Sequence, residues 1–182
     1  MPSEQIPEPW SSFFAAIDGA LKERVDLECL GAFVLSALHG LPRPTADVDV
    51  VSITPREQRE FLLGLAGQGS PLHKKHRVYL EHVTVAAVPV DYEQRLRGMF
   101  PGAFTHLRLL ALDPYDLALS KLERNSQRDR DDVKFLARSA RLSLQVLQQR
   151  YEEELRPNLG NPQREDLTLR LWMEAIEEER TG

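Results

Sequence analysis

The stretch LGAFVLSALHGLPRPTADVDV, residues 30–50, decides the fold of this chain. An apolar run with helical spacing follows Gly31 and stops at Gly40, a loop with two prolines comes next, and an alternating β-branched run begins at Asp47. Apolar residues at helical spacing indicate an amphipathic helix, whereas alternation indicates a half-buried strand. The stretch therefore predicts a helix that begins beside a glycine, and then a strand over residues 47–53.

Two aspartates, Asp47 and Asp49, lie two residues apart on this predicted strand. Because side chains alternate across a strand, both carboxylates point to one face, about 7 Å apart, while Val48 and Val50 point to the other. Two carboxylates aimed at one volume repel each other unless a divalent cation lies between them. An isolated Asp-x-Asp pair more often marks an exposed strand face, so the metal interpretation depends on the surrounding residues.

A third acid and a glycine supply that context. Asp91 ends a valine-rich run that predicts a strand over residues 83–92, although an acid there also commonly marks a strand end. If the two strands are neighbours, Asp91 completes a cluster that can hold two Mg²⁺ ions about 3.5–4 Å apart. Gly31 lies between a predicted strand and a helix, where backbone N–H groups bind phosphates well, although a tight turn also explains a glycine.

The remaining pattern predicts a mixed α/β protein, an α/β (α+β) fold with a sheet flanked by helices. Residues 1–112 are expected to form this core with its N-terminal helix, and residues 113–182 a C-terminal helical part packed on it. Helices are predicted at 10–23, 55–65, 114–124, 128–139, 143–155 and 162–179, and further strands at 25–30, 78–80 and 108–112. Asp113 is expected to cap the helix that Pro114 opens, and residues 67–71 are expected to form a loop.

Composition excludes several classes of protein. The chain has 182 residues, a formal net charge of −5 and one cysteine, Cys29, which rules out a disulfide framework and a cysteine-based zinc site. No run approaches the roughly 18 apolar residues of a membrane span, and the N-terminus lacks the pattern of a secretory signal. We therefore expect a cytoplasmic protein without a membrane partner.

In their order and spacing, these motifs resemble the nucleotidyltransferase superfamily of the DNA polymerase beta type. Its signature is a hydrophobic residue, Gly, then Gly or Ser, an Asp-x-Asp on the next strand and a third acid on a later strand. The matching residues are Leu30-Gly31-Ala32, Asp47-Val48-Asp49 and Asp91.

Within this superfamily, residues 39–50 resemble more closely a bacterial branch that holds the abortive-infection type IV toxin nucleotidyltransferases and related small uncharacterised nucleotidyltransferase-like proteins. Members tend to carry Gly, Arg and Thr before the Asp-x-Asp, as Gly40, Arg43 and Thr45 do here. Arg43 and Thr45 are therefore expected to brace this loop or contact phosphate.

A later helical motif of the branch is matched by Lys121, Arg124, Arg128, Asp129 and Asp132. The resemblance implies that Lys121 and Arg124 contact the triphosphate, and that Asp129 and Asp132 orient Lys121 or the nucleotide. Asp129 and Asp132 can instead cap the helix that begins near 129, because acids favour that end of a helix.

The implied function is transfer of a nucleoside monophosphate from a nucleoside triphosphate to a hydroxyl. Asp47, Asp49 and Asp91 would hold two Mg²⁺ ions, and Asp91 would accept the proton of the hydroxyl. The acceptor would be a tRNA end or other RNA, a protein or a small molecule, and a toxin would need a neutralising antitoxin protein as partner.

Two alternatives remain beside this one. Ala32 stands where the superfamily has Gly or Ser and supplies no hydroxyl to a phosphate, which favours a binding or interaction module that has kept the fold and lost turnover. A metal-dependent phosphodiesterase would use similar carboxylates, but such hydrolases usually add histidines, and none of the five here falls at the acidic sites.

Overall fold

The computed structural model describes residues 5–84 and 87–181, and the chain forms two compact units. The first unit comprises residues 1–85 and 96–112, and the second comprises residues 86–95 and 113–182. Residues 86–95, which were expected in the core, are thus part of the mainly helical unit.

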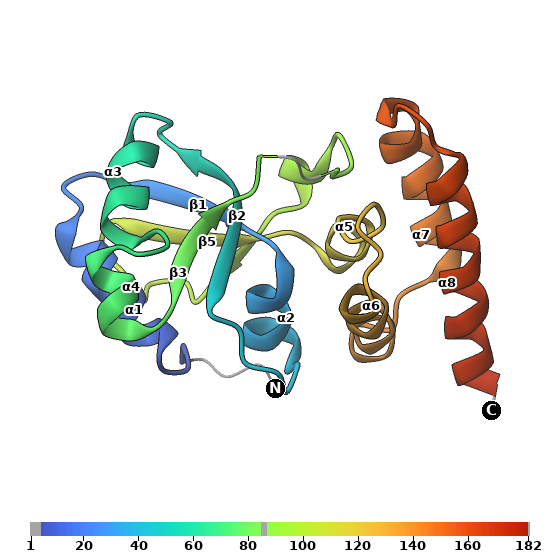
Figure 1. Cartoon of the computed structure of the whole chain (residues 1–182), viewed down its shortest axis with the longest axis horizontal. Coiled ribbons are helices and arrows are strands. Elements are labelled where there is room, and N and C mark those ends of the chain that lie inside the picture. The colour runs from blue at the N-terminus through green and yellow to red at the C-terminus, as the bar shows by residue number, and fades with distance from the viewer. Residues whose placement is uncertain (1–4, 85–86, 182) are drawn as a thin grey trace. The chain divides into compact units, whose positions relative to one another are not determined.

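A five-stranded mixed sheet organises the first unit (Figure 1). Its spatial order is β3-β2-β1-β5-β4. Strand β1 is antiparallel to β2 and parallel to β5, β2 is parallel to β3, and β4 is antiparallel to β5. This mixed sheet with its helices confirms the predicted α/β class. The strands are β1 (Val25–Cys29), β2 (Asp47–Thr54), β3 (Tyr79–His82), β4 (Arg97–Met99) and β5 (Leu107–Ala111).

Four α-helices accompany the sheet. Helices α1, α3 and α4 contact one another and lie together on the left of Figure 1, and α2 contacts β2. Phe33 of α2 also packs against Trp10 and Phe14 of α1, with ring centroids 5.1 and 5.5 Å apart. The core takes Phe13, Phe14 and Ile17 from α1, all fully buried, together with Val48 and Val50 from β2. The helices are α1 (Trp10–Ala20), α2 (Gly31–His39), α3 (Gln58–Ala66) and α4 (Pro71–His76).

The strand predicted over residues 83–92 is wrong. Strand β3 ends at His82, and Tyr92–Arg95 forms a 3₁₀ turn, η1, while residues 85–86 of the prediction lie outside the described residues. The ladder ends with the Val83 N–H donating to the Val50 carbonyl at 2.9 Å. Further on, Pro89 has no N–H to offer a ladder, and the Val90 N–H donates to a carbonyl of the second unit.

Three smaller differences also concern element bounds. Helix α3 begins at Gln58 and not at Pro55, because Thr54 still belongs to β2. Residues 67–71 were expected as a loop, yet Ser70 caps helix α4 and Pro71 opens it in the usual way. The three-residue strand β4 carries too little pattern to be found in the sequence.

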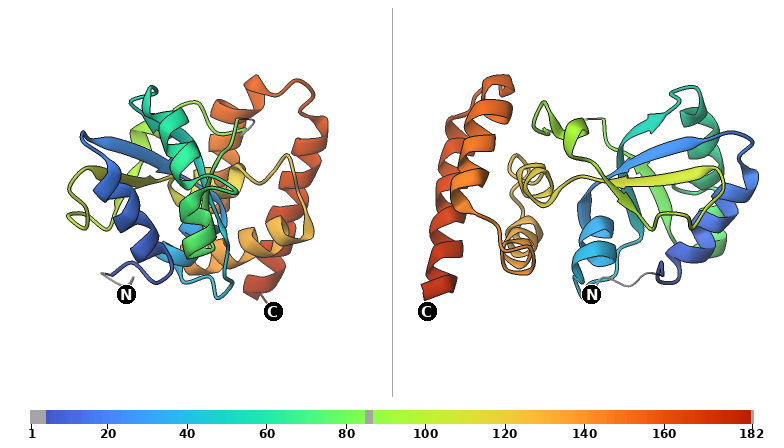
Figure 2. Two further views of the ribbon diagram at one scale, coloured as in Figure 1. Left: turned by 60° about the vertical axis from the view of Figure 1, so that its left-hand side comes forward. Right: turned by 180° about the vertical axis from the view of Figure 1, so that it is seen from behind.

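The second unit is built from helices α5 (Pro114–Leu119), α6 (Gln127–Ser139), α7 (Leu144–Arg150) and α8 (Gln163–Thr181). Helix α7 continues through a π-helical turn, η2 (Tyr151–Leu155), into a 3₁₀ turn, η3 (Arg156–Asn158). Both views in Figure 2 show α7 and η2 alongside α8, and the Tyr151 hydroxyl donates to Asp166 of α8 at 2.7 Å. The predicted cap of α5 is confirmed, since the Asp113 carboxylate accepts from the Asp116 N–H.

Partly and fully buried ion pairs attach the described residues 87–95 to this unit. Arg95 donates two hydrogen bonds to Asp116, at 3.0 and 3.1 Å, and two to Glu154, the shorter at 2.6 Å. Arg150 donates to Asp113 and Asp116 from another helix. Because Asp116 is fully buried, its charge requires both arginines.

Among the described residues, no helix has the length and apolar character needed to cross a bilayer.

Candidate metal and nucleotide site

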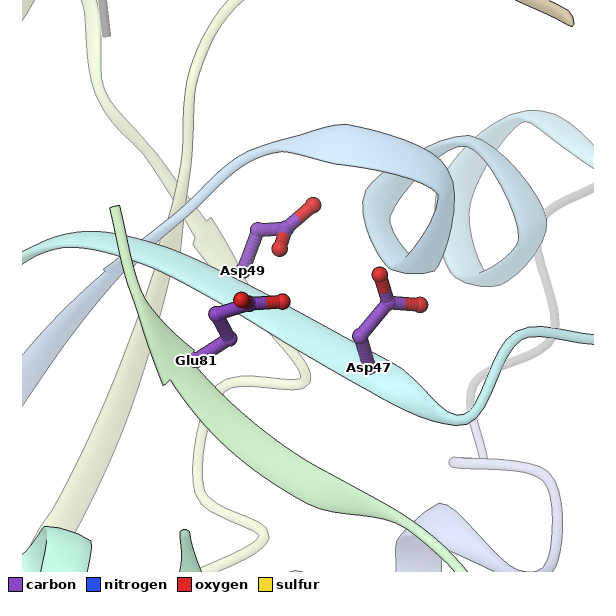
Figure 3. A group of neighbouring side chains, drawn as sticks. All are labelled: Asp47, Asp49 and Glu81. Carbon is purple, nitrogen blue, oxygen red and sulfur yellow. The ribbon is translucent and has the colours of Figure 1, made fainter. Parts of the chain in front are cut away.

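Three carboxylates converge on one face of the sheet (Figure 3). Asp47 and Asp49 of β2 and Glu81 of β3 each place a carboxylate oxygen so that all three lie within 4.8 Å of one another. Asp49 and Glu81 are register partners in the parallel pair, and partners in a ladder point to the same face. Since Val48 and Val50 are fully buried on the other face, the predicted division of β2 into a polar and a packing face is confirmed.

Helix α2 begins against the Asp49 carboxylate. The Leu30 N–H donates to the Asp49 carbonyl at 3.0 Å, and Gly31 then adopts a left-handed φ of +75°. A Cβ atom at Gly31 would lie 3.1 Å from Cγ of Asp49 and nearer still to its Oδ2. Figure 3 shows Asp47 and Asp49 directed toward the start of α2. Glycine is therefore needed here for its conformation and for the space it leaves to a carboxylate.

The three carboxylates create a negative potential that helps to raise the pKa of neighbouring groups. Tyr79 is the register partner of Asp47, and burial followed by the charges of Asp47, Glu81 and Asp49 raises the pKa of its hydroxyl. Complete burial, followed by the charge of Asp49, likewise raises the pKa of the Cys29 thiol. Such a concentration of negative charge on one face favours a cation.

The loop before β2 supports Asp47. The Thr45 hydroxyl donates to the Asp47 carboxylate, so Thr45 restricts the orientation of that side chain. The Arg43 carbonyl accepts a hydrogen bond from the Ser36 hydroxyl at 2.9 Å, which ties the loop to α2. The Thr45 hydroxyl and the Arg43 backbone carbonyl thus tie down this loop, while the roles of the two residues in bracing it for catalysis or in contacting phosphate stay predictions.

Comparison with known families identifies the class of protein. Residues 18–180 match DUF6036, a family described as a nucleotidyltransferase of unknown function. The chain belongs to this family. No curated protein and no solved structure matches the chain. The nucleotidyltransferase family agrees with the general activity expected from the motifs, while the abortive-infection branch within the superfamily stays a prediction.

For a nucleotidyltransferase, the expected phosphate-binding residues of the second unit form a connected ion cluster. Lys121 is only 5 % exposed, and its Nζ lies 2.9 Å from Asp132 and 3.5 Å from Asp129. Arg124 donates two hydrogen bonds to Asp129, at 2.8 and 2.6 Å. Asp129 also forms the capping box of α6 with Ser126. Asp129 thus takes part in capping α6 and lies beside Lys121, while its role in orienting Lys121 or the nucleotide stays a prediction.

The charge of Asp129 is strongly favoured by these partners. Burial alone would raise its pKa, but hydrogen bonds from Arg124 and Ser126 and the charge of Lys121 hold that pKa far below its usual value. Contact of Lys121 and Arg124 with a nucleotide's triphosphate stays a prediction. What the structure provides is a lysine and an arginine held in fixed orientation by two carboxylates.

The third acid expected from the sequence, Asp91, lies in a turn of the second unit just before η1. Its carboxylate accepts a hydrogen bond from the Gln94 side chain at 3.2 Å. Its role as metal ligand and proton acceptor stays a prediction. The residue that the structure gathers with Asp47 and Asp49 is Glu81, which was missed because the strand prediction ended at Leu80.

A signal for Glu81 was present in the sequence. Tyr79 and Glu81 alternate with the apolar residues Val78 and Leu80, which is the pattern of a strand with one polar face. Extending that strand by one residue would have placed an acid on the same face as Tyr79. Only the register of β3 against β2 shows that this face is the one that carries Asp49.

Proposed function

We propose that the protein is a Mg²⁺-dependent enzyme that transfers a nucleoside monophosphate from a nucleoside triphosphate to a hydroxyl acceptor. The observation that carries the proposal is the convergence of Asp47, Asp49 and Glu81 beside the glycine that begins α2. The family assignment supports the same general chemistry. Beyond the description of the family, the proposal specifies the metal, the triphosphate donor and the hydroxyl acceptor.

The donor set fits magnesium. All three groups offer carboxylate oxygens, which are the ligands that Mg²⁺ prefers, and none offers the nitrogen or sulfur that would favour zinc. Asp47, Asp49 and Glu81 would hold the metal, with Thr45 and the close approach of Gly31 fixing the two aspartates. When bound, Mg²⁺ supplies positive charge to the phosphate oxygens on which negative charge develops.

The start of α2 provides a place for phosphate oxygens. Backbone N–H groups at a helix N-terminus have no partner within the helix and carry the positive end of its dipole. In the proposed complex, the N–H groups of Gly31 and Ala32 donate to the triphosphate, next to the carboxylates. Ala32 keeps its N–H, so the missing hydroxyl removes one hydrogen bond and leaves the backbone contact in place.

The proposed reaction balances as a single displacement. The acceptor oxygen forms a bond to the α-phosphorus, the bond from that phosphorus to the oxygen bridging the β-phosphate breaks, and diphosphate leaves with the electron pair. A carboxylate accepts the proton of the hydroxyl, an assistance typically worth about 10²–10⁴ in rate. Asp91 is the sequence-based candidate for this task.

The test uses the full chain with Mg²⁺, each α-labelled triphosphate in turn, and total tRNA, other RNA or protein as acceptor. We expect label to reach one acceptor, with release of diphosphate, and to be lost in the Asp47→Asn, Asp49→Asn and Glu81→Gln variants. Glu60→Gln, which changes an exposed carboxylate on α3, should keep the activity. Asp91→Asn tests its proposed role separately, since loss of transfer without loss of metal affinity would identify a proton acceptor.

A second candidate is a nucleotide-binding module without turnover, which the alanine at position 32 favours. It predicts that a triphosphate binds with Mg²⁺ and is recovered unchanged in the presence of every acceptor. Calorimetric titration beside the transfer assay separates the two proposals. Binding without transfer would support the module, and transfer would exclude it.

If the acceptor is tRNA, a neutralising antitoxin protein becomes the expected partner.

A further inference from the structure

Helix α8 carries a stripe of exposed residues whose spacing along the sequence alternates between three and four positions. We call Arg164, Leu167, Leu171, Glu174 and Glu178 the outer stripe. All five are exposed, and the two leucines are 46 % and 52 % exposed. Steps of three and four keep residues on one side of a helix and are the spacing with which two helices pack along a seam.

The opposite side of α8 already packs within its own unit. Leu169, Trp172 and Ile176 are buried, and the Trp172 indole N–H donates to Asn125 at 3.1 Å. Glu179 pairs with a lysine and an arginine of α6. One side of α8 therefore packs within the second unit, while the two leucines of the outer stripe are exposed on the other side.

Charge along the outer stripe is self-complementary. Its N-terminal end carries Arg164, its centre carries Leu167 and Leu171, and its C-terminal end carries Glu174 and Glu178. If a second copy of α8 lies antiparallel with Leu167 opposite Leu171, the same register places Arg164 opposite Glu174, on both sides of the axis. A two-fold interface needs just such a patch, in which one surface contacts its own copy.

We infer that the outer stripe is an interface between two copies of this chain, paired antiparallel through α8. A parallel pair is disfavoured because it would place Glu174 and Glu178 against their own copies. Arg164 already contacts Glu165 at 3.3 Å and the Glu123 carbonyl, yet its side chain is 66 % exposed. A guanidinium has five N–H donors, so Arg164 can bind the second carboxylate without losing the first.

The size of the contact limits its strength. A single pair of helices over about three turns buries less than the 1,200–2,000 Å² of a standard stable interface, so we expect a weak dimer that dissociates on dilution. The dimer is independent of the proposed nucleotidyl transfer. Its failure would leave that proposal untouched, and the reverse also holds.

Sedimentation velocity of the full chain, from about 1 µM to about 500 µM, tests the inference. We expect a monomer–dimer equilibrium that Leu167→Glu abolishes. Arg164→Glu and Glu174→Arg should each weaken the dimer at least about tenfold, and the double variant should restore it, because the charges are exchanged and not removed. Arg128→Glu, an exposed change on α6, should leave it unaltered.

Circular dichroism of each variant checks that the helices are retained. A chain that stays monomeric up to the highest concentration would overturn the inference. A dimer that survives Leu167→Glu, or a double charge variant that associates no better than the single ones, would also overturn it, because another surface or another register would then be in use.

Discussion

Replacing Gly31 by alanine should damage the candidate site more than any comparable glycine substitution in this chain. Gly31 has a φ of +75°, and a Cβ atom there would meet the Asp49 carboxylate, 3.1 Å from its Cγ. The substitution therefore has two unfavourable effects: it strains the backbone at a left-handed φ, and it forces a Cβ atom into the space that the Asp49 carboxylate occupies. The two can be separated because Gly40 has the same φ with no atom within 4 Å of its Cβ position.

The expected magnitudes follow from these two geometries. A left-handed φ costs an alanine about 1–2 kcal/mol, which is the whole expected loss of unfolding free energy for Gly40→Ala. Gly31→Ala adds the cost of forcing atoms into a packed volume, about 1–3 kcal/mol. The clash also turns Asp49 away from Asp47 and Glu81, so affinity for Mg²⁺ or Mn²⁺ should fall at least about tenfold, an effect of about 1.4 kcal/mol.

Urea unfolding and calorimetric metal titration of the two variants and the unaltered chain measure both effects. Gly40→Ala should lose stability and keep its metal affinity, whereas Gly31→Ala should lose more stability and most of its affinity. The reasoning is refuted if the two variants are equally stable and bind metal alike. That result would mean that Asp49 has room to move without cost, and that its approach to the start of α2 does not shape the site.

Three further outcomes are expected. Asp132→Asn leaves Lys121 buried with only its more distant carboxylate and should lower the free energy of unfolding by about 3 kcal/mol, measured by urea denaturation at pH 7. Because Asp129 has a folded-state pKa far below its ordinary value, its stabilisation is present above about pH 4 and lost as the pH falls below it, so acid should destabilise the unaltered chain more than Asp129→Asn. Equal acid sensitivity of the two would contradict this, provided both fold at pH 7. Cys29 is fully buried with a raised pKa, so a thiol reagent at pH 8 should modify it only after unfolding, and rapid modification of the folded chain would show that the strand opens.

Local pattern was sufficient wherever neighbours in sequence decide the structure. The helix after Gly31, its end at Gly40, and the two-faced strand from Asp47 follow from spacing and alternation, and all are confirmed. The cap at Asp113 follows from the proline after it, since both residues favour the start of a helix. These features depend on interactions within a few residues, which a single sequence displays.

The segment after His82 shows where local pattern failed. Its valines predict a strand, but an isolated strand is stable only if a partner offers a ladder, and β2 offers β3 four paired residues before the two separate. The arginine that follows, Arg95, binds Asp116 and Glu154, which are 21 and 59 residues away along the chain. No local property of the valines indicates this attachment.

By itself, the sequence determined the α/β class, the pair of aspartates on one strand face, and the glycine that begins the neighbouring helix. Each of these depends on short-range spacing. Only the tertiary structure decided that Glu81 joins Asp47 and Asp49, since the register between β2 and β3 sets which side chains meet. Register is a property of two segments separated by about thirty residues, and it is fixed by the packing of both on a shared core.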